Sequence, residues 1–505
     1  MYTASPCRAW QGTQQTSSPD IQQLDRYFDK AQKAWEVPGL SVAIVKDGKV
    51  VLSKGYGQLE SGKATAPDGN TLYAIASNTK AFIAASLAML VEEGKVSWDD
   101  PVLKHLPYFR MYDDYVTQNI TVEDLLCHRS GLGTFGGDVV WYKSEYNPEE
   151  VIRHIGSMDA VFPFRAGYGY SNLMFITAGE VIRAVSGMSW AEFVEKKIFQ
   201  SLQMTRSLTS VQGLSQTTNV ATPHKLAEGT HSPIAWTNWD NMGAAGGIIS
   251  SVNDMAKWMQ LQIDRGTFEG QSIFSEKMQD KFWTPHNNFT LSRDSEYYPS
   301  RNFSGYGLGW GIADKKGRKV VSHGGGYDGM YSRVVIVPEE KLGVVVLTNG
   351  MRGISSALTN YVLDAYLQDG QRDWSADMLE IQGAREERRK ELLANWHKNR
   401  QADLPPTVEA QKLCGEYFDP MFGSIEIKQQ GEMLLLEFPK APKLNAQLTH
   451  WQSNTYQINW NETHAWFDFG TLQFLLDNKG KPKRLQFDVP NGDIFFHEIE
   501  AVRKR

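Results

Sequence analysis

Two short apolar runs, residues 41–45 and 49–52, stand on either side of Asp47-Gly48. An Asp-Gly pair between apolar runs is a strong signal for a two-residue turn. This pattern predicts a β-hairpin over residues 40–57. From about residue 78 to 93 the apolar positions change to a helical period, and Gly94 stands where that helix should end. The segments 121–127, 172–187 and 252–264 predict further apolar helices.

Three β-rich runs, 319–322, 331–337 and 343–347, are separated by turn residues at 324–329 and 338–340. Their spacing predicts an antiparallel meander, which a helix over 355–368 follows. We expect the first hairpin and this meander to share one sheet, with helices on its faces and a helical lobe at one side. The predicted fold class is therefore α+β.

Composition changes along the chain predict four parts. Residues 1–21 are polar and rich in Ser, Thr and Gln, so we expect them to be loosely ordered. Residues 22–370 form the first domain. Residues 371–408 are crowded with charges and end at Pro405-Pro406, which predicts a solvated helical linker. Residues 409–505 alternate short strands with turns and predict a separate small all-β domain, a barrel or a sandwich.

Charge and hydropathy exclude several classes of protein. Lys and Arg total 52 and Asp and Glu total 58, a net charge of −6, so we expect no nucleic-acid partner. The longest apolar run, about 81–91, is too short to cross a bilayer, and no transmembrane segment is expected. Residues 1–6 lack the basic and apolar regions of a signal peptide, so none is expected in this chain.

Common metal and nucleotide motifs are missing from the chain. Three cysteines, Cys7, Cys127 and Cys414, are far apart and predict no disulfide framework. C-x-x-C, H-E-x-x-H, the P-loop motif and G-x-S-x-G do not occur. We therefore expect neither a metal nor an organic cofactor.

Ser77 and Lys80 form the one S-x-x-K motif of the sequence, and it stands directly before the apolar helix. If the helix begins here, both side chains lie on one face, one turn apart, and the amine can reach the hydroxyl. A serine becomes a good nucleophile only when a base takes its proton, and a lysine serves as that base only if its pKa falls. The alternative is a chance match in which Ser77 caps the helix.

Two further clusters are candidates. Tyr170 could relay a proton between Lys80 and a leaving group, and Asn172 could bind a substrate amide; the alternative is a packed Tyr and a helix-capping Asn. His323-Gly324-Gly325 ends a β-run, where small residues let a substrate backbone approach. The amide of Gly326 could then form an oxyanion hole with the amide of Ser77. The alternative is a glycine-rich turn with an exposed histidine.

Taken together, the three clusters appear in the order S-x-x-K, Y-x-N, H-x-G. This arrangement resembles the serine β-lactamase and penicillin-binding-protein family. Within this family, the Y-x-N motif resembles that of the branch that contains class C β-lactamases, D-aminopeptidases and related esterases. The stretches 120–132, 245–251 and 306–311 also resemble that branch. The resemblance covers about residues 22–370, and the last ~95 residues resemble the lipocalin-like domain of some members.

The resemblance implies a role for each residue. Ser77 would be the acylated nucleophile, Lys80 and Tyr170 would share the base and acid work, and Gly326 would complete the oxyanion hole.

Asn172, His323, Gly324 and Gly325 would bind substrate. The family usually acts outside the cytoplasm, which implies a periplasmic or secreted protein. It also implies a small-molecule or short-peptide substrate.

One departure from the family pattern concerns His323, which stands where β-lactamases and many carboxypeptidases have lysine. Lysine is a permanent cation for a substrate carboxylate, whereas histidine is mostly neutral at pH 7. This difference disfavours β-lactam hydrolysis and carboxypeptidase activity. We therefore expect a serine hydrolase that cleaves amide or peptide bonds through an acyl-enzyme, in D-amino-acid-containing peptides. The alternatives are a carboxylesterase or β-lactamase with the same residues, and a non-catalytic binding or scaffolding protein.

Four other residues need separate interpretation. His128 follows an apolar helix and precedes Ser130-Gly131, so we expect a capping or hydrogen-bonded structural role. Trp141, Trp236 and Trp239 could line a substrate cleft, but such tryptophans are more often core or rim residues.

Overall fold

A computed structural model describes residues 19–291, 301–370 and 372–505. The loosely ordered segment expected at 1–21 lies mostly outside the described residues. Helix α1 (Ile21–Ala34) already begins at the end of that segment, where the Asp20 side chain accepts a hydrogen bond from the backbone N–H of Gln22. No helix within the described ranges is both long enough and apolar enough to cross a membrane.

The first domain is built on one antiparallel sheet of eight strands, in the order β2-β1-β14-β13-β12-β11-β10-β9. The predicted hairpin and the predicted meander share this sheet, as expected, because β1 pairs with β14 along its length. The strands are β1 (Gly39–Lys46), β2 (Lys49–Gly57), β9 (Asn287–Asn288), β10 (Ser304–Tyr306), β11 (Gly311–Lys315), β12 (Arg318–Tyr327), β13 (Met330–Val337) and β14 (Leu342–Thr348).

Both faces of the sheet are covered, which explains the unbroken apolar runs of its central strands. Val42 and Ile44 of β1 join the core shared with α1 and α13 (Ile354–Leu367). Ala43 and Val45, which point the other way, join the larger core that includes α2 (Thr79–Glu92) and α11 (Val252–Ile263). Alternation with a period of two therefore divides one strand between two cores.

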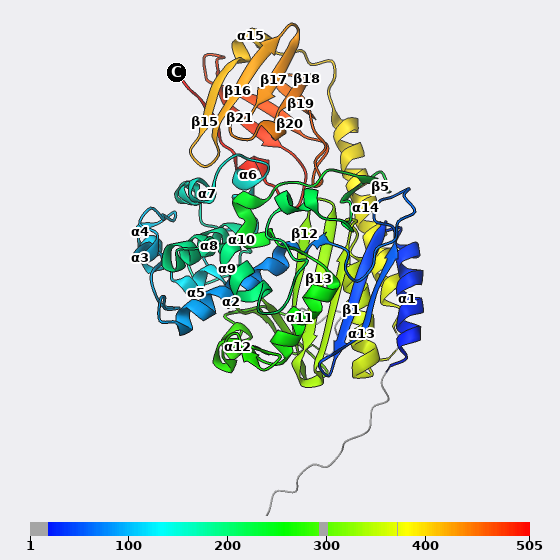
Figure 1. The fold of residues 1–505 in the computed structure, drawn as a ribbon. Coiled ribbons are helices and arrows are strands. Elements are labelled where there is room, and N and C mark those ends of the chain that lie inside the picture. Colours follow the sequence, from blue (N-terminus) through cyan, green and yellow to red (C-terminus); the bar gives the residue numbers. More distant parts are fainter. Residues whose placement is uncertain (1–18, 292–300, 371) are drawn as a thin grey trace, which may run out of the picture.

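A helical lobe lies beside the sheet on the α2 side (Figure 1). Its centre is the pair α2 and α8 (Asn172–Ser186), both almost entirely buried. Around them lie α3 (Val102–His105), α4 (Asp114–Asn119), α5 (Val122–Leu125), α6 (Asp138–Trp141), α7 (Pro148–His154), α9 (Trp190–Val194), α10 (Gly243–Gly246) and α12 (Glu276–Phe282). The short strand pairs are β3 (Tyr73–Ala74) with β6 (Ile249–Ser250), β4 (His224–Ala227) with β5 (Thr230–Pro233), and β7 (Thr267–Phe268) with β8 (Gln271–Ser272).

The C-terminal domain is a closed antiparallel barrel of eight strands. Along β16 (Gly423–Gln430), Ile425 and Ile427 are buried in the core of the barrel, while the residues between and after them are more exposed. The other strands are β15 (Gly415–Asp419), β17 (Met433–Glu437), β18 (Ala446–Gln452), β19 (Thr455–Trp460), β20 (Thr471–Leu476), β21 (Pro482–Asp488) and β22 (Val502–Arg503); the short helix α15 (Ala410–Leu413) precedes β15.

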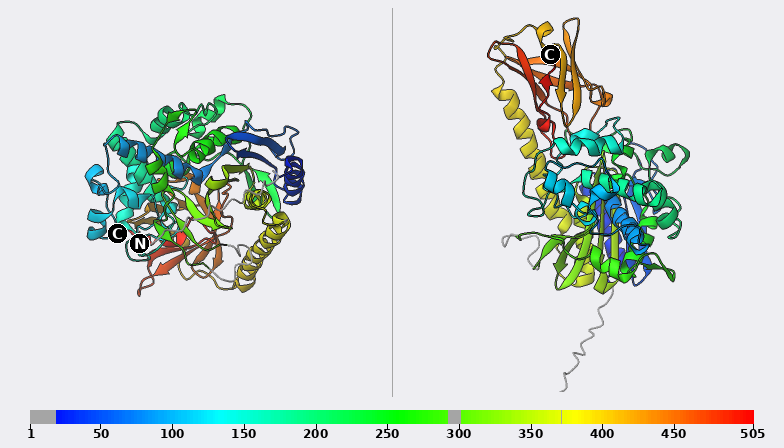
Figure 2. Two further views of the ribbon diagram at one scale, coloured as in Figure 1. Left: turned by 90° about the horizontal axis from the view of Figure 1, so that it is seen from below. Right: turned by 90° about the vertical axis from the view of Figure 1, so that its left-hand side faces the viewer.

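The charged segment between the domains forms one helix, α14 (Trp374–Asn399). Trp374 at its start is buried in the core with α1 and α13, and Trp396 near its end packs edge-on against Phe469 of the barrel. Figure 2 shows α14, in yellow, running along the first domain up to the barrel. Because one end of α14 packs on the first domain and the other on the barrel, this helix contacts both of the domains that it connects.

Candidate active site

A cavity of about 410 Å³ opens where the helical lobe, the sheet and the barrel meet. Ser77, Tyr170, Asn172 and His323, which come from distant parts of the sequence, all line it. Aromatic and apolar side chains form much of the remaining wall: Phe135, Trp141, Tyr168, Trp239, Met242, Phe289, Tyr306, Trp466 and Ile494. A concave, largely apolar cavity with a few converging polar groups is the usual form of a small-molecule site.

Ser77 lies in a single 3-10 turn, Ala76–Asn78, directly before α2. Ala76 has a φ of 47°, in the left-handed region that non-glycine residues rarely adopt. Ser77 is half-buried and faces the cavity, while its neighbours are buried. The tight turn therefore presents this one hydroxyl to the cavity.

The amine of Lys80 lies directly behind Ser77. Its Nζ is 3.1 Å from Oγ of Ser77, 2.7 Å from Oδ1 of Asn172 and 2.8 Å from the carbonyl oxygen of Ala245. The side chain is fully buried, and burial lowers the pKa of Lys80 to about 7. A buried amine with this pKa can accept a proton near neutral pH, so it meets both requirements of a general base for Ser77.

Tyr170 lies on the other side of Ser77. Burial raises the pKa of the Tyr170 phenol well above its usual value, and a side-chain hydrogen bond with Ser77 acts against that rise. The amine of Lys80 is 4.8 Å from the centroid of the Tyr170 ring. The phenol therefore stays protonated at neutral pH and can donate a proton close to Ser77.

Asn172 connects Lys80 to the buried carboxyl group of Asp138, which no motif in the sequence marks. Its Nδ2 donates a 2.6 Å hydrogen bond to Oδ2 of Asp138, the first residue of α6. Burial raises the pKa of Asp138 to about 8, against the opposite effects of the Trp141 and Asn172 side chains and of the charge of Lys80. In the described part of the chain, Oδ1 of Asp138 and Nε1 of Trp141 both lack a partner at hydrogen-bond distance, although Trp141 is near enough to lower the pKa of Asp138.

His323 does not end its strand. We expected His323 and the glycines after it to mark a strand end or a turn, but β12 continues to Tyr327 and the turn falls at Asp328-Gly329. His323 is also buried, not exposed as the turn alternative required. The strand continues because Gly324, Gly325 and Gly326 all keep their pairing with β13.

The hydrogen bonds of His323 define its charge. The carbonyl oxygen of Gly324 lies 2.6 Å from Nδ1, which must therefore donate, and Nε2 accepts from the hydroxyl of Tyr306 at 2.8 Å. Burial and, to a smaller extent, the positive charge of Lys80 lower the pKa of His323 to about 3. The imidazole is therefore neutral at pH 7, and the fixed cation that a lysine would supply is missing from this position.

The glycines after His323 face different ways. Gly324 and Gly326 line the cavity. Gly325, which we expected to bind substrate, packs against the turn that holds Ser77: a Cβ atom there would lie 2.3 Å from the carbonyl oxygen of Ile75. Its missing side chain lets β12 approach that turn, and this brings the backbone of Gly326 to the same cavity as Ser77.

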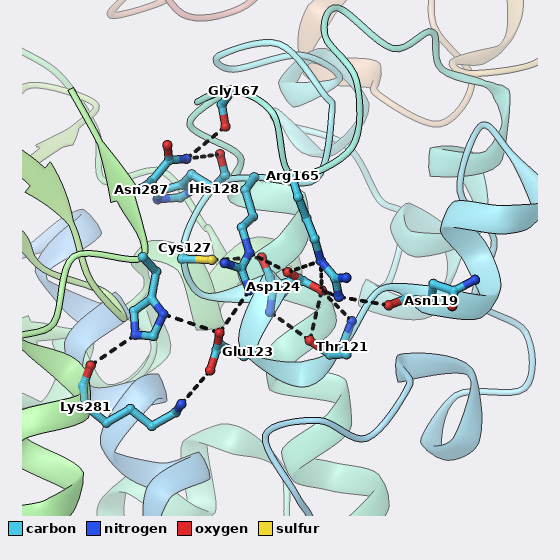
Figure 3. Close-up of polar contacts among 12 residues, drawn as sticks. Asn119, Thr121, Glu123, Asp124, Cys127, His128, Arg165, Gly167, Lys281 and Asn287 are labelled. Atoms are coloured by element: carbon cyan, nitrogen blue, oxygen red, sulfur yellow. Dashed lines mark hydrogen bonds and ion pairs between the residues drawn. The ribbon is translucent and has the colours of Figure 1, made fainter. Parts of the chain in front are cut away.

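His128 has the structural role that we expected. Its Nδ1 accepts a 3.0 Å hydrogen bond from the backbone N–H of Ser171, and its ring lies 4.2 Å from that of Tyr170. Figure 3 shows how the surrounding loop is fixed: Asn287 donates to the carbonyl oxygens of His128 and Gly167, and Asp124 binds Arg165. The ring of His128 therefore packs against the ring of Tyr170, and His128 does not line the cavity.

Of the three tryptophans, Trp141 and Trp239 line the cavity, with ring centroids 5.3 Å apart, although both are largely buried. Trp236 instead packs on Tyr327.

The barrel supplies part of the wall that the motifs could not predict. Trp466, Asp493 and Ile494 line the same cavity as Ser77. Trp466 lies against the oxyanion candidate, because a Cβ atom on Gly326 would be 3.2 Å from its Cη2. Burial raises the pKa of Asp493 to about 6. The cavity thus holds two carboxyl groups, Asp138 from the lobe and Asp493 from the barrel.

Comparison with known proteins agrees with this geometry. The family model "Beta-lactamase" matches residues 24–368. The chain belongs to the Beta-lactamase family. A second model, a domain of unknown function (DUF3471), matches residues 399–503, which contain the barrel.

Relatives and solved structures extend the comparison. The chain is 29% identical over 452 residues to "Unguisins hydrolase ungD'" of Aspergillus campestris (strain IBT 28561), covering 84% of this chain and 80% of that protein. It is similar in fold to the octameric penicillin-binding protein homologue from Pyrococcus abyssi (TM-score 0.63, 24% identity, 96% of this chain and 100% of that one). It also resembles a D-stereospecific amidohydrolase from Streptomyces sp. (TM-score 0.55, 23% identity, 69% of this chain and 98% of that one). The protein is a serine hydrolase of the Beta-lactamase family.

Proposed function

We propose that this hydrolase removes an N-terminal residue from short peptides or amides, with a preference for D-amino acids. The observation that carries the proposal is the pair of carboxyl groups, Asp138 and Asp493, in the cavity of Ser77. Among the described residues, Oδ1 of Asp138 has only the Trp141 indole near it, beyond hydrogen-bond distance, and Asp493 is close enough to raise the pKa of Asp138 through its charge. Asp493 is ionised at pH 7, because its pKa is about 6, and its charge suits the ammonium group of a free N-terminus. The neutral carboxyl group of Asp138 beside it can accept a hydrogen bond from the same group.

The reaction would proceed through an acyl-enzyme. Lys80 takes the proton from Oγ of Ser77 as Oγ attacks the carbonyl carbon. The amides of Ser77 and Gly326 hold the oxyanion of the tetrahedral intermediate. Tyr170 gives its proton to the leaving nitrogen as the C–N bond breaks and regains one from Lys80. Water then attacks the ester, and its proton leaves by the same groups, which releases the acid and restores Ser77.

The barrel supports removal of a single residue. Trp466 lies against Gly326 in the wall of the cavity, and Asp493 lines the same cavity. An ammonium group bound at Asp493 would place the first residue of the substrate between the barrel and Ser77. The fold similarity to a D-stereospecific amidohydrolase supports the preference for D-residues.

An esterase is the second candidate, because the aromatic wall of the cavity also suits an apolar acyl or alcohol group. Hydrolysis of β-lactams is disfavoured by the neutral His323 in the third motif.

A substrate panel tests the proposal. D-alanine p-nitroanilide, its N-acetyl derivative, the L-enantiomer and p-nitrophenyl acetate are compared in the native protein and in Asp493→Asn. We expect kcat/KM for the free amine to exceed that for the N-acetyl compound by about tenfold or more, as the loss of a charge-assisted hydrogen bond predicts. Asp493→Asn should reduce this ratio and leave the ester rate nearly unchanged. Equal rates for the free and acetylated amines, or a preference for the L-enantiomer, would contradict the proposal.

A further inference from the structure

A second cavity lies next to the active site, between α14, the sheet and the barrel. Its volume of about 570 Å³ exceeds that of the active-site cavity and lies within the range of small-molecule sites. We call it the α14 cavity. Trp466 and Asp493 line both cavities, so the two cavities share part of their walls.

The walls of the α14 cavity are of two kinds. Apolar and aromatic groups come from the first domain, from the barrel and from the end of α14: Leu226, Tyr331, Met351, Leu392, Trp466 and Pro490. The helix α14 also contributes Arg385, Arg388 and Arg389 to the lining. Their spacing of three and four residues places these three guanidinium groups on one face of α14.

The α14 cavity carries three arginines against two carboxyl groups, Glu386 and Asp493, so positive charge is in excess. Arg389 pairs with Asp468, at 3.3 Å, and Glu386 is engaged by Arg352, at 3.2 Å. Arg385 and Arg388 make no hydrogen bond and no ion pair with any residue in the described ranges.

Arg385 is nevertheless close to the aromatic wall, since its charge lowers the pKa of Tyr331, while burial and the charge of Asp493 raise it. Two guanidinium groups that have no partner among the described residues therefore line a cavity that also has an aromatic wall.

We propose that the α14 cavity is a second binding site, for a small carboxylate with an apolar or aromatic body. A guanidinium group binds a carboxylate through two parallel hydrogen bonds, and an exposed arginine keeps its charge at all relevant pH values. The aromatic wall takes the apolar part, which an inorganic anion lacks. If the proposed function holds, such ligands include the acid released by deacylation and the C-terminal ends of peptide substrates.

A titration with a matched pair of probes tests the proposal: N-acetyl-D-phenylalanine and its amide differ only in the carboxylate. Binding is measured by calorimetry in the full-length Ser77→Ala protein, in which no turnover occurs. The same protein with Arg385→Gln and Arg388→Gln tests the location. Lys390→Gln is the matched control, because it removes one charge from the same helix outside the α14 cavity, where Lys390 pairs with Glu387.

We expect the acid to bind at least tenfold more tightly than the amide, as charged hydrogen bonds predict. The double arginine variant should lose that difference, and Lys390→Gln should keep it. Three results would overturn the proposal. They are equal affinity for the acid and the amide, binding of the acid that survives the double variant, and no binding of the acid at about 10 mM, which is a concentration above that of a millimolar dissociation constant. The arginines are exposed, so their replacement leaves the fold intact. Since no step depends on turnover, a failure here is distinct from a failure of the proposed peptidase activity.

Discussion

Glu498 of the barrel accepts a 2.8 Å hydrogen bond from the backbone N–H of Gly137 in the helical lobe. Gly137 precedes α6 with a φ of 76°, and the next residue is Asp138. The barrel therefore shapes the active site in two ways. Asp493 lines the cavity directly, and Glu498 fixes the backbone that presents Asp138.

Glu498→Ala should weaken binding of free-amine substrates, because it leaves the buried N–H of Gly137 without a partner and loosens the turn before Asp138. We expect KM to rise by roughly threefold to tenfold, the effect of a lost hydrogen bond of about 1 kcal/mol. Glu498→Gln is the matched control, since its amide oxygen can still accept from Gly137. Steady-state kinetics with D-alanine p-nitroanilide measure both. Similar KM values for the two variants would show that the contact does not position Asp138.

Lys80 and Tyr170 should act as one unit. Lys80→Ala should lower turnover by roughly a hundredfold or more, the usual effect of losing a general base, and Tyr170→Phe should also slow turnover. Because both side chains contact the hydroxyl of Ser77, the double variant should lose less than the product of the two single effects. Full additivity would contradict a shared proton relay.

Labelling of Ser77 provides the control for those variants. A fluorophosphonate probe should acylate Ser77 and no other serine in the native protein, as intact-mass analysis and peptide mapping would show. The Ser77→Ala protein should remain unlabelled. A label that persists in that variant would place the nucleophile elsewhere.

Local spacing explains why the centre of the site was predictable. Ser77 and Lys80 are three residues apart, so a helix that begins between them brings the amine to the hydroxyl. Asn172 begins α8, and α8 packs against α2 in the buried centre of the lobe. These positions depend on helix geometry and on burial, which the apolar pattern reveals.

The rest of the site depends on contacts that no local pattern records. Asp138 is an isolated acidic residue in the sequence, and only burial beside Asn172 distinguishes it. Asp493 and Trp466 reach the cavity because the barrel docks on the lobe. His323 was expected at a strand end because glycines follow it, whereas pairing with β13 extends the strand past all three of them.

The pH dependence of acylation should follow Lys80. Only the neutral amine can take the proton of Ser77, and burial lowers the pKa of Lys80 to about 7. The rate should therefore rise with pH through about 7 and level off above it. The ionised form of Asp138 raises the pKa of Lys80, so Asp138→Asn should move the rising limb to lower pH.

A pH profile of kcat/KM with p-nitrophenyl acetate, which carries no titrating group of its own, measures this shift. Asp138→Asn keeps an oxygen that can accept from Asn172, so the geometry of the site is retained. A limb that stays in place, or moves to higher pH, would contradict the coupling between Asp138 and Lys80.

Replacement of His323 tests what the neutral imidazole does for specificity. Since burial lowers its pKa to about 3, His323 offers no charge to a substrate carboxylate at pH 7. His323→Lys would add a cation there, and an ion pair worth about 1 kcal/mol changes a rate ratio by roughly fivefold. The ratio of kcat/KM for free-acid over amide-ended peptides should rise by at least that factor, and the relative kcat/KM for β-lactams should rise too.

Absolute rates of the His323→Lys protein should fall, because the hydrogen bond with Tyr306 is lost. His323→Gln, which stays neutral, should leave the ratio unchanged. If the native protein already prefers free acids and His323→Lys does not change the ratio, then charge at this position does not determine the choice of substrate.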